Sequence, residues 1–302
     1  MPCNNPITGY RAPGGQVKFN KMEGWIDREI TVPCGRCMGC RLEKSRQWAV
    51  RIMHEAQMYE PWQTHFITLT YNDENLPAYG TLVKKDWQDF AKRWRKKHGK
   101  FRYYHCGEYG TKFGRPHYHA AVFGMELDLE VDGKTKTGNL AFRSNDLDET
   151  WGKGRTQVGS LTFESAAYVA RYITKKIGGR TRIEDDPYGV YDQDTGERVF
   201  EKQDEYVTMS RGRRADGEGG IGYRWIKRWN KDVYRRDEVF MREHFQKPPK
   251  YYDNEYELID PDHMAKIRGR RARNHRERSP RQQRDNEIYL ERVEKMHERD
   301  TI

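Results

Sequence analysis

The sequence predicts an α+β fold in which helices back a mostly antiparallel β-sheet. Segments rich in β-branched and aromatic residues are typical of strands, and three occur at Thr64–Tyr71, Phe101–Gly107 and His117–Gly124. A stretch with helical spacing separates the first two, and a turn at Gly110–Pro116 separates the last two. The order strand, helix, strand, turn, strand implies an antiparallel sheet with helices packed against it.

Two amphipathic helices are predicted around the first strand. From Arg41 to Tyr59 apolar residues recur at helical spacing, and Pro61 ends the pattern. From Leu82 to Lys97 the large apolar residues, which include Trp87 and Trp94, form one stripe. This spacing favours core packing of both tryptophans over stacking on nucleic-acid bases.

A third helix is predicted at Thr162–Ile177. Thr162 can cap it, Glu164 stands in its first turn, and two glycines follow it. The next segment, Arg180–Glu205, is polar and turn-rich, which indicates an inserted hairpin or loop. Glu205–Ser210 fits one more strand.

The two ends of the chain differ from its centre. Met1–Gln16 is rich in Pro, Gly and Asn and is expected to be irregular, and a cysteine knuckle follows at Cys34–Cys40. Lys266–Arg284 is rich in Lys and Arg, which is typical of a segment that is solvated or disordered until it binds. We therefore expect an N-terminal knuckle and helix over 1–60, a core over 61–235, and a C-terminal extension with a basic tail over 236–302.

The charge of the chain points to an anionic partner. Its 302 residues carry a formal net charge of +10, and the sequence pI is about 9.2. A chain this basic commonly binds nucleic acid, and a solvated basic surface without a ligand is the alternative. The sequence has no apolar stretch of membrane-spanning length and no signal-peptide pattern at its start. We expect a cytoplasmic protein without membrane contact.

Cysteines are concentrated near the N-terminus. In a reducing cytoplasm, Cys3, Cys34, Cys37 and Cys40 favour metal binding or free thiols over disulfides. The spacing of the last three is compatible with zinc, and Cys3 would have to fold back to join them. Structural zinc and unliganded thiols both remain open, whereas Cys106 fits a small apolar residue within its strand.

Two histidines indicate a metal site. His117 and His119 stand two apart on a predicted strand, so both imidazoles share one face, with Tyr118 on the other. Either they bind a metal ion, or they are surface or hydrogen-bonded polar groups. Glu108 could reach the same ion if its strand pairs with theirs, and this ligand set suits Mg²⁺ or Mn²⁺ acting on a phosphate. A cupin-type site would need a carboxylate soon after the second histidine. Ala120–Met125 contains none, which disfavours a cupin-type site.

A tyrosine pair supplies a candidate nucleophile. Tyr168 and Tyr172 lie one turn apart on one helix face, beside a separate apolar stripe that can fill the core. A tyrosine hydroxyl can attack a phosphodiester, but its pKa of about 10 means that it needs help from a metal ion. Lys175 could orient the phosphate or assist proton transfer, and Arg171 and Lys176 could contact the DNA backbone.

These residues resemble the motifs of the HUH endonucleases. His117-Tyr118-His119 resembles their His-hydrophobic-His motif, and Phe66–Thr70 resembles their structural first motif. Tyr168-x-x-x-Tyr172-x-x-Lys175 is similar to the paired-tyrosine motif of the initiators of small icosahedral phages. Three further motifs resemble those of the replication initiators of gokushovirus-type microviruses: Cys34-Gly35-x-Cys37-x-x-Cys40, Gly107-Glu108-Tyr109-Gly110 and Pro248-Pro249-x-Tyr251-Tyr252.

The resemblance implies a fold and an activity. The fold is a five-stranded antiparallel sheet with flanking helices, related to the palm and RNA-recognition topology, and Glu108 is the third metal ligand. One tyrosine attacks the single-stranded viral origin and leaves a 5′-phosphotyrosine and a free 3′-OH. The second tyrosine cleaves the regenerated origin, and the 3′-OH closes a circle. This is the initiation and termination of rolling-circle replication in the cytoplasm of a bacterial host.

The sequence also bears on the partners of the protein and on two alternative functions. Gly133-Lys134-Thr135 lacks the upstream glycine of a phosphate loop, because that position is Asp128, so a host helicase would unwind the DNA for the polymerase. A non-catalytic single-stranded nucleic-acid-binding protein is one alternative, although it has no use for the coupled histidines and tyrosines. A metal oxidoreductase is the other, and it predicts bound iron and no covalent DNA adduct.

Overall fold

The computed structural model describes residues 3–110, 113–135, 138–175, 188–274 and 278–299, without the side chains of 172–175 and 294–299. Contacts divide the chain into two compact units, one of Met1–Lys44 with Lys266–Ile302 and one of Ser45–Ala265. The division at residues 60 and 235 expected from the sequence remains a prediction.

The larger unit is built on an antiparallel sheet that has seven strands within the described residues. Their order across the sheet is β12 (Tyr206–Met209), β5 (Arg102–Tyr109), β6 (Pro116–Phe123), β4 (Thr64–Thr70), β9 (Thr156–Ser160), β8 (Leu140–Arg143) and β7 (Glu130–Lys134). The α+β class and the antiparallel sheet are confirmed. The sheet has two strands more than the resemblance implies, because the hairpin β7–β8 extends the edge beside β9.

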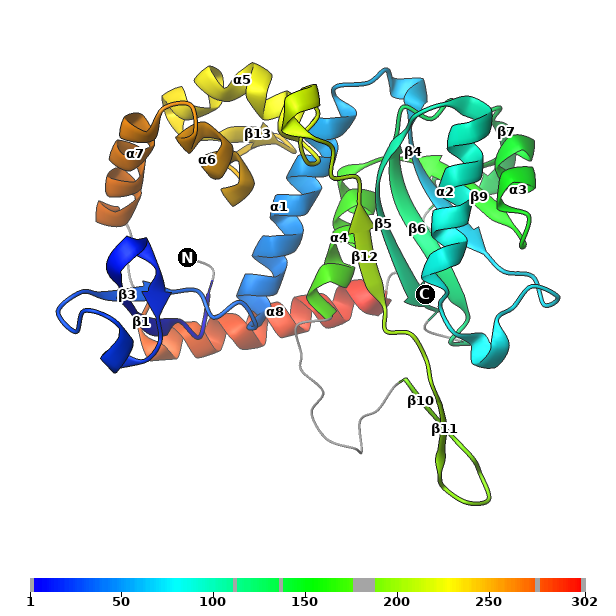
Figure 1. The fold of residues 1–302 in the computed structure, drawn as a ribbon, viewed down its shortest axis with the longest axis horizontal. Helices are drawn as coiled ribbons and strands as arrows, with labels where there is room; N and C mark the ends of the chain where they lie inside the picture. Colours follow the sequence, from blue (N-terminus) through cyan, green and yellow to red (C-terminus); the bar gives the residue numbers. More distant parts are fainter. Residues whose placement is uncertain (1–2, 111–112, 136–137, 176–187, 275–277, 300–302) are drawn as a thin grey trace. The chain divides into compact units, whose positions relative to one another are not determined.

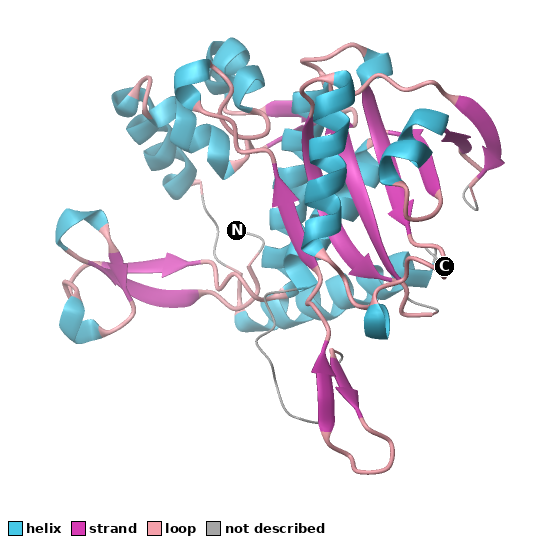
Figure 2. Ribbon diagram, turned by 45° about the vertical axis from the view of Figure 1, so that its right-hand side comes forward, coloured by secondary structure: helices cyan, strands magenta, loops and turns pink. Residues whose placement is uncertain are grey.

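Helices cover both faces of this sheet. On one face α2 (Lys84–His98) and α3 (Asn145–Trp151) form a core with the strands, and α2 lies across them (Figures 1 and 2). On the other face α1 (Met38–Ala56) and α4 (Phe163–Lys175) form a second core. Trp87 and Trp94 are 2% and 1% exposed, so the predicted core packing of both tryptophans is confirmed.

Strand β6 shows how its sequence divides side chains between the two cores. Tyr118, Ala120 and Val122 enter the core under α2, and Ala121 and Phe123 enter the core under α4. Successive side chains on a strand point to opposite faces. The histidines at 117 and 119 therefore lie on the α4 face, as the alternation of the sequence predicts.

The predicted elements of the central region are present with small shifts of their ends. Helices α1, α2 and α4 and strands β4, β5, β6 and β12 match the sequence patterns. The segment after α4 contains the hairpin β10 (Gly189–Tyr191) and β11 (Arg198–Glu201), which extends beyond the end of the sheet (Figure 1). The sequence patterns missed β7, β8, β9 and α3, which are short and weakly periodic.

The rest of the larger unit follows the sheet in the chain. It consists of α5 (Tyr223–Arg236), the hairpin β13 (Val239–Met241) and β14 (His244–Gln246), α6 (Lys250–Glu257) and the start of α7 (Pro261–Arg273). Single-turn 3₁₀ helices of the two units lie at Pro13–Gly15, Lys21–Glu23, Pro61–Gln63, Ala78–Gly80 and Arg214–Asp216.

The smaller unit corrects two predictions. β1 (Ile7–Arg11) pairs with β2 (Val17–Lys18) and β3 (Glu29–Val32), so the stretch expected to be irregular contains a strand whose partners lie later in the chain. The basic segment Lys266–Arg284 is helical rather than disordered where it is described, in α7 and α8 (Pro280–Arg299), and most of its side chains are exposed, as expected of a solvated segment. Arginine and glutamine are good helix formers, and both helices begin with proline after Asp260 or Ser279, which are favourable cap residues.

Candidate active site

The register of two strands places a carboxylate beside two imidazoles. Glu108 of β5 pairs with His117 of β6, and His119 follows on the same face. Nε2 of His117 lies 2.8 Å from Oε1 of Glu108, and Nε2 of His119 lies 2.9 Å from the same oxygen. The ligand atoms of the three residues all lie within 4.8 Å of one another, so this cluster can hold a metal ion.

The other ring nitrogen of each histidine has its own partner. Nδ1 of His117 lies 3.0 Å from the carbonyl oxygen of Arg115, which can only accept a hydrogen bond. Nδ1 of His119 lies 2.8 Å from Oγ1 of Thr68, and the ring of Phe66 stacks on His119 at a centroid distance of 5.3 Å. A proton held on Nδ1 leaves the lone pair of a neutral imidazole on Nε2, which is how metal-binding histidines are usually oriented.

Glu108 is a buried carboxylate, and one of its two oxygens has no hydrogen-bond partner among the described residues. The residue is 1% exposed. Burial alone would raise the pKa of Glu108, but the charge of His119 and the hydrogen bonds of both histidines lower it to about 2. Its Oε2 is buried and has no hydrogen-bond partner among the described residues. A buried carboxylate oxygen without a partner is costly, and a cation bound between Glu108 and the imidazoles would remove that cost.

The two histidines differ in their electrostatics. Burial lowers the pKa of His119, and the charge and hydrogen bond of Glu108 oppose this only in part. For His117 burial also lowers the pKa, but the hydrogen bond and charge of Glu108 outweigh burial and raise it. The neutral form of imidazole is the one that ligates metals.

Tyr168 reaches this cluster from α4. Its hydroxyl donates a hydrogen bond of 2.8 Å to Oε1 of Glu108, and its ring meets that of His119 edge-on at 5.3 Å. Burial, and then the charge and hydrogen bond of Glu108, raise the pKa of Tyr168 far above its ordinary value, while Arg171 acts in the opposite direction. The phenol therefore keeps its proton at neutral pH in this arrangement.

Helix α4 positions this phenol through its apolar stripe. Ala166, Val169 and Ala170 are fully buried, and the ring of Tyr168 packs at the border of the same core. Helix α4 includes the backbones of Tyr172 and Lys175. Their side chains, and all of Lys176, lie outside the described residues. The structure thus brings together Glu108, His117, His119 and Tyr168.

Sequence reasoning missed two partners of the histidines. Thr68 lies opposite His119 in the pairing of β4 with β6, and Phe66 stacks on the same ring. Both residues were assigned only a structural role in their strand. Alternation along β4 puts them on one face, but the sequence alone does not say which strand lies beside it.

A second group of side chains that could hold a metal ion lies in the smaller unit. The sulfurs of Cys3, Cys34, Cys37 and Cys40 lie within 4.8 Å of one another, and all four are free thiols. Burial would raise the pKa of Cys34, but backbone N–H groups that donate to its sulfur lower it to about 7. Cys106 is fully buried in β5, as expected of a small apolar residue.

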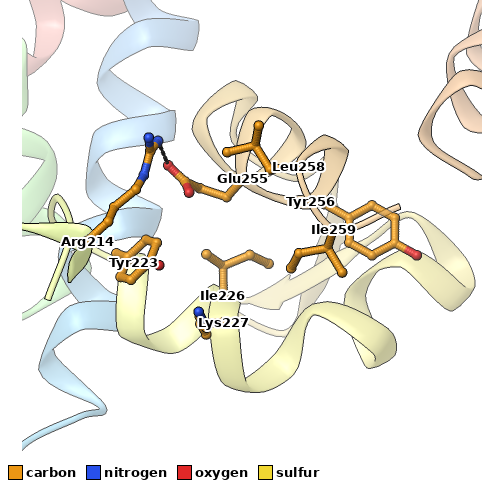
Figure 3. A pocket seen from close by; sticks show the side chains of 8 residues that line it. All are labelled: Arg214, Tyr223, Ile226, Lys227, Glu255, Tyr256, Leu258 and Ile259. Carbon is orange, nitrogen blue, oxygen red and sulfur yellow. Dashed lines mark hydrogen bonds and ion pairs between the residues drawn. The ribbon is translucent and has the colours of Figure 1, made fainter. Parts of the chain in front are cut away.

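A hollow of about 210 Å³ between α5 and α6 does not belong to either group. Figure 3 shows its apolar floor and an ion pair between Arg214 and Glu255 at one side. The residues that line it are Arg214, Tyr223, Ile226, Lys227, Glu255, Tyr256, Leu258 and Ile259.

Among the described helices, none combines the length and apolar character that crossing a bilayer requires.

Known proteins match the region that carries these residues. The family model described as "Replication-associated protein ORF2/G2P" matches residues 64–177, which include β4, β6 and α4. The chain is 35% identical over 260 residues to Replication-associated protein ORF2 of Spiroplasma virus 4, covering 81% of this chain and 73% of that protein. It is 29% identical over 277 residues to Replication-associated protein VP4 of Bdellovibrio phage phiMH2K, covering 87% of this chain and 79% of that protein.

A third relative matches a shorter stretch. Replication-associated protein ORF4 of Chlamydia phage 1 is 33% identical over 157 residues, which are 48% of this chain and 38% of that protein. No solved structure is significantly similar to the chain. The extent of the first two matches supports a role in phage replication, and the chain belongs to the family of replication-associated proteins of gokushovirus-type microviruses.

Proposed function

We propose that this protein initiates rolling-circle replication by nicking and rejoining single-stranded viral DNA at its origin through a covalent phosphotyrosine. One observation carries the proposal: the Tyr168 hydroxyl lies 2.8 Å from Glu108, which also contacts His117 and His119. A protein that only holds DNA has no need of a nucleophile beside a potential metal site. The five adjacent strands β12, β5, β6, β4 and β9 would be the HUH core, with β7 and β8 added at one edge.

The proposed reaction is a transesterification. The Tyr168 oxygen attacks the phosphorus of one origin phosphodiester, and the bond from that phosphorus to the 3′ oxygen breaks. The phenol loses a proton and the departing 3′ oxygen gains one, so no other reactant is consumed. The products are a 5′-phosphotyrosine and a free 3′-OH, from which a host polymerase extends while a host helicase unwinds the template.

Several residues of the chain would support this step. His117, His119 and Glu108 would hold Mg²⁺ or Mn²⁺, which would neutralise charge on the scissile phosphate. Thr68 and the Arg115 carbonyl hold the imidazoles in place. Because the Tyr168 ring packs against the core, its hydroxyl is already ordered before DNA arrives, which lowers the entropic cost of attack.

Neighbouring residues of α4 extend the proposal to a complete cycle. Tyr172 would cleave the regenerated origin, after which the first 3′-OH attacks the phosphotyrosine and closes a circle. Lys175 would orient the phosphate or assist proton transfer, and Arg171 and Lys176 would contact the DNA backbone. This cycle would take place in the cytoplasm of the bacterial host, where the viral DNA is copied.

The test is an adduct assay with the full chain. Protein incubated with origin single strand and Mn²⁺ is expected to form a protein–DNA product that survives denaturation, and prior addition of EDTA should prevent it. The readout is a shifted band on a denaturing gel. If the protein binds the DNA tightly but forms no adduct with either Mg²⁺ or Mn²⁺, it is instead a non-catalytic single-strand-binding protein.

Thr68 offers a finer test of the metal site. Thr68→Val keeps the shape of the side chain but removes the hydroxyl beside Nδ1 of His119. Loss of such a partner is expected to weaken Mn²⁺ binding and adduct formation by roughly 10- to 100-fold. Thr64→Val is the matched control, because Thr64 lies on the same strand opposite Phe123, and its hydroxyl donates a hydrogen bond to the Pro61 carbonyl. Equal Mn²⁺ affinity in both variants would contradict the role of Thr68.

A further inference from the structure

We propose that Cys3, Cys34, Cys37 and Cys40 bind a structural zinc ion, and that this ion holds the C-terminal helix α8 in place. The site is separate from the cluster around Glu108 and lies within the smaller unit. Four protein ligands would fill a tetrahedral ion completely, which is typical of structural rather than catalytic zinc. The inference does not depend on DNA cleavage.

The sulfurs have the spacing of a zinc tetrahedron. Zinc–sulfur bonds of about 2.3 Å place the sulfurs of a tetrahedral site roughly 3.8 Å apart. The sulfurs of Cys3 and Cys37 lie 3.9 Å apart, and all four lie within 4.8 Å of one another. All four are free thiols, so none is committed to a disulfide. A soft ligand set of four sulfurs selects zinc or an iron–sulfur centre over Mg²⁺ or Mn²⁺.

Backbone N–H groups already point at these sulfurs. The sulfur of Cys34 accepts from the N–H of Cys37 at 3.3 Å and from that of Arg36 at 3.4 Å. The sulfur of Cys3 accepts from Cys34, and the sulfur of Cys37 accepts from Asn4, each at 3.3 Å. Hydrogen bonds of this kind orient the sulfurs in the way that the outer shell of a metal site orients its ligands.

The segment around the cysteines has little else to hold it together. Apart from cysteines, the buried apolar side chains of residues 3–44 are those of Tyr10, Ala12 and Met38. A segment of about 40 residues cannot build a sufficient apolar core of its own, and a metal site is a common substitute. The three-stranded sheet of β1, β2 and β3 therefore needs the ion for stability.

One carboxylate connects the cysteines to α8. Oε1 of Glu287 accepts the backbone N–H of Met38 at 2.7 Å, and Oε2 accepts the side-chain amide of Asn4. Asn4 follows Cys3 and Met38 follows Cys37, so both donors are neighbours of ligands. Asn4 is 2% exposed and also accepts a hydrogen bond of 2.8 Å from Asn286. A zinc ion that orders Cys3 and Cys37 therefore orders both donors for Glu287.

The metal is tested first by its stoichiometry. The full chain, expressed with zinc in the medium, is expected to contain one zinc per molecule by elemental analysis and native mass spectrometry. Cys37→Ser should lower this content several-fold, whereas Cys106→Ala, which changes the cysteine outside the cluster, should leave it unchanged. A wild-type chain without zinc, a chain with iron in its place, or full zinc retention in Cys37→Ser would each overturn the proposal.

The link to α8 is tested by limited trypsin digestion. Glu287→Ala is expected to keep its zinc but to be cut within α8 roughly tenfold faster, because a charge-assisted pair of hydrogen bonds is lost. Wild type stripped by a zinc chelator should show the same acceleration, and Glu291→Ala, which changes an exposed carboxylate of α8, should not. Unchanged α8 cleavage after zinc removal would refute the link even if zinc is bound.

Discussion

Replacing both Tyr168 and Tyr172 with phenylalanine is expected to abolish the covalent adduct with origin DNA while DNA binding stays nearly intact. Phenylalanine preserves the ring that packs beside the core but lacks the attacking oxygen. Removal of a covalent nucleophile typically costs at least about 10³-fold in rate. The adduct is measured on denaturing gels and the binding by fluorescence anisotropy, so the two effects are separated.

The single variants distinguish the two tyrosines. The Tyr168 hydroxyl lies 2.8 Å from Glu108, so Tyr168→Phe alone is expected to lose most of the first cleavage. Tyr172→Phe should still form a first adduct but should fail to release closed circles. Tyr59→Phe, just after the end of α1, is the control for loss of a phenol elsewhere in the same unit. An undiminished adduct in the double variant would exclude both tyrosines as nucleophiles.

Replacing Glu108 is expected to have the next largest effect. Glu108→Gln keeps the size of the side chain but removes the negative charge that faces both imidazoles. The pKa of Glu108 is lowered to about 2, so the carboxylate is ionised throughout the working range and its charge is available to a metal ion at any assay pH. Loss of a ligand with this charge should weaken Mn²⁺ binding and slow adduct formation by about 10²- to 10³-fold.

The measurement is a Mn²⁺ titration by calorimetry beside the adduct rate. Glu255→Gln is the control, because Glu255 of α6 is also a buried carboxylate and pairs with Arg214 rather than with a histidine. Its variant should bind Mn²⁺ and form adduct nearly as wild type does. Unchanged Mn²⁺ affinity in Glu108→Gln would place the metal elsewhere and remove Glu108 from the site.

The lowered pKa of Glu108 also predicts how the stability of the fold depends on pH. Its pKa lies below the ordinary value of 4.5, so the ionised form stabilises the fold above that value. This contribution declines as the pH falls from about 4.5 through 2. In the metal-free protein Glu108→Gln should therefore lower the melting temperature at neutral pH.

Local sequence determined the elements that carry the candidate site. Alternation along β6 put His117 and His119 on one face, and the spacing of α4 put Tyr168 at the border of its apolar stripe. These features depend on the backbone geometry of a few consecutive residues, so a single sequence is enough to predict them. The capped starts of α7 and α8 are also present in the sequence, but the basic composition of Lys266–Arg284 predicts a solvated or disordered segment rather than helices.

Only the tertiary structure decided which elements meet. Glu108 faces His117 because β5 pairs with β6 in one register, and Thr68 faces His119 because β4 lies on the other side of β6. The hydroxyl of Tyr168 reaches Glu108, 60 positions earlier in the chain, only because α4 packs on that face of the sheet. Register and packing are set by the free energy of contacts between distant segments, and the residue pattern within each segment does not contain that information.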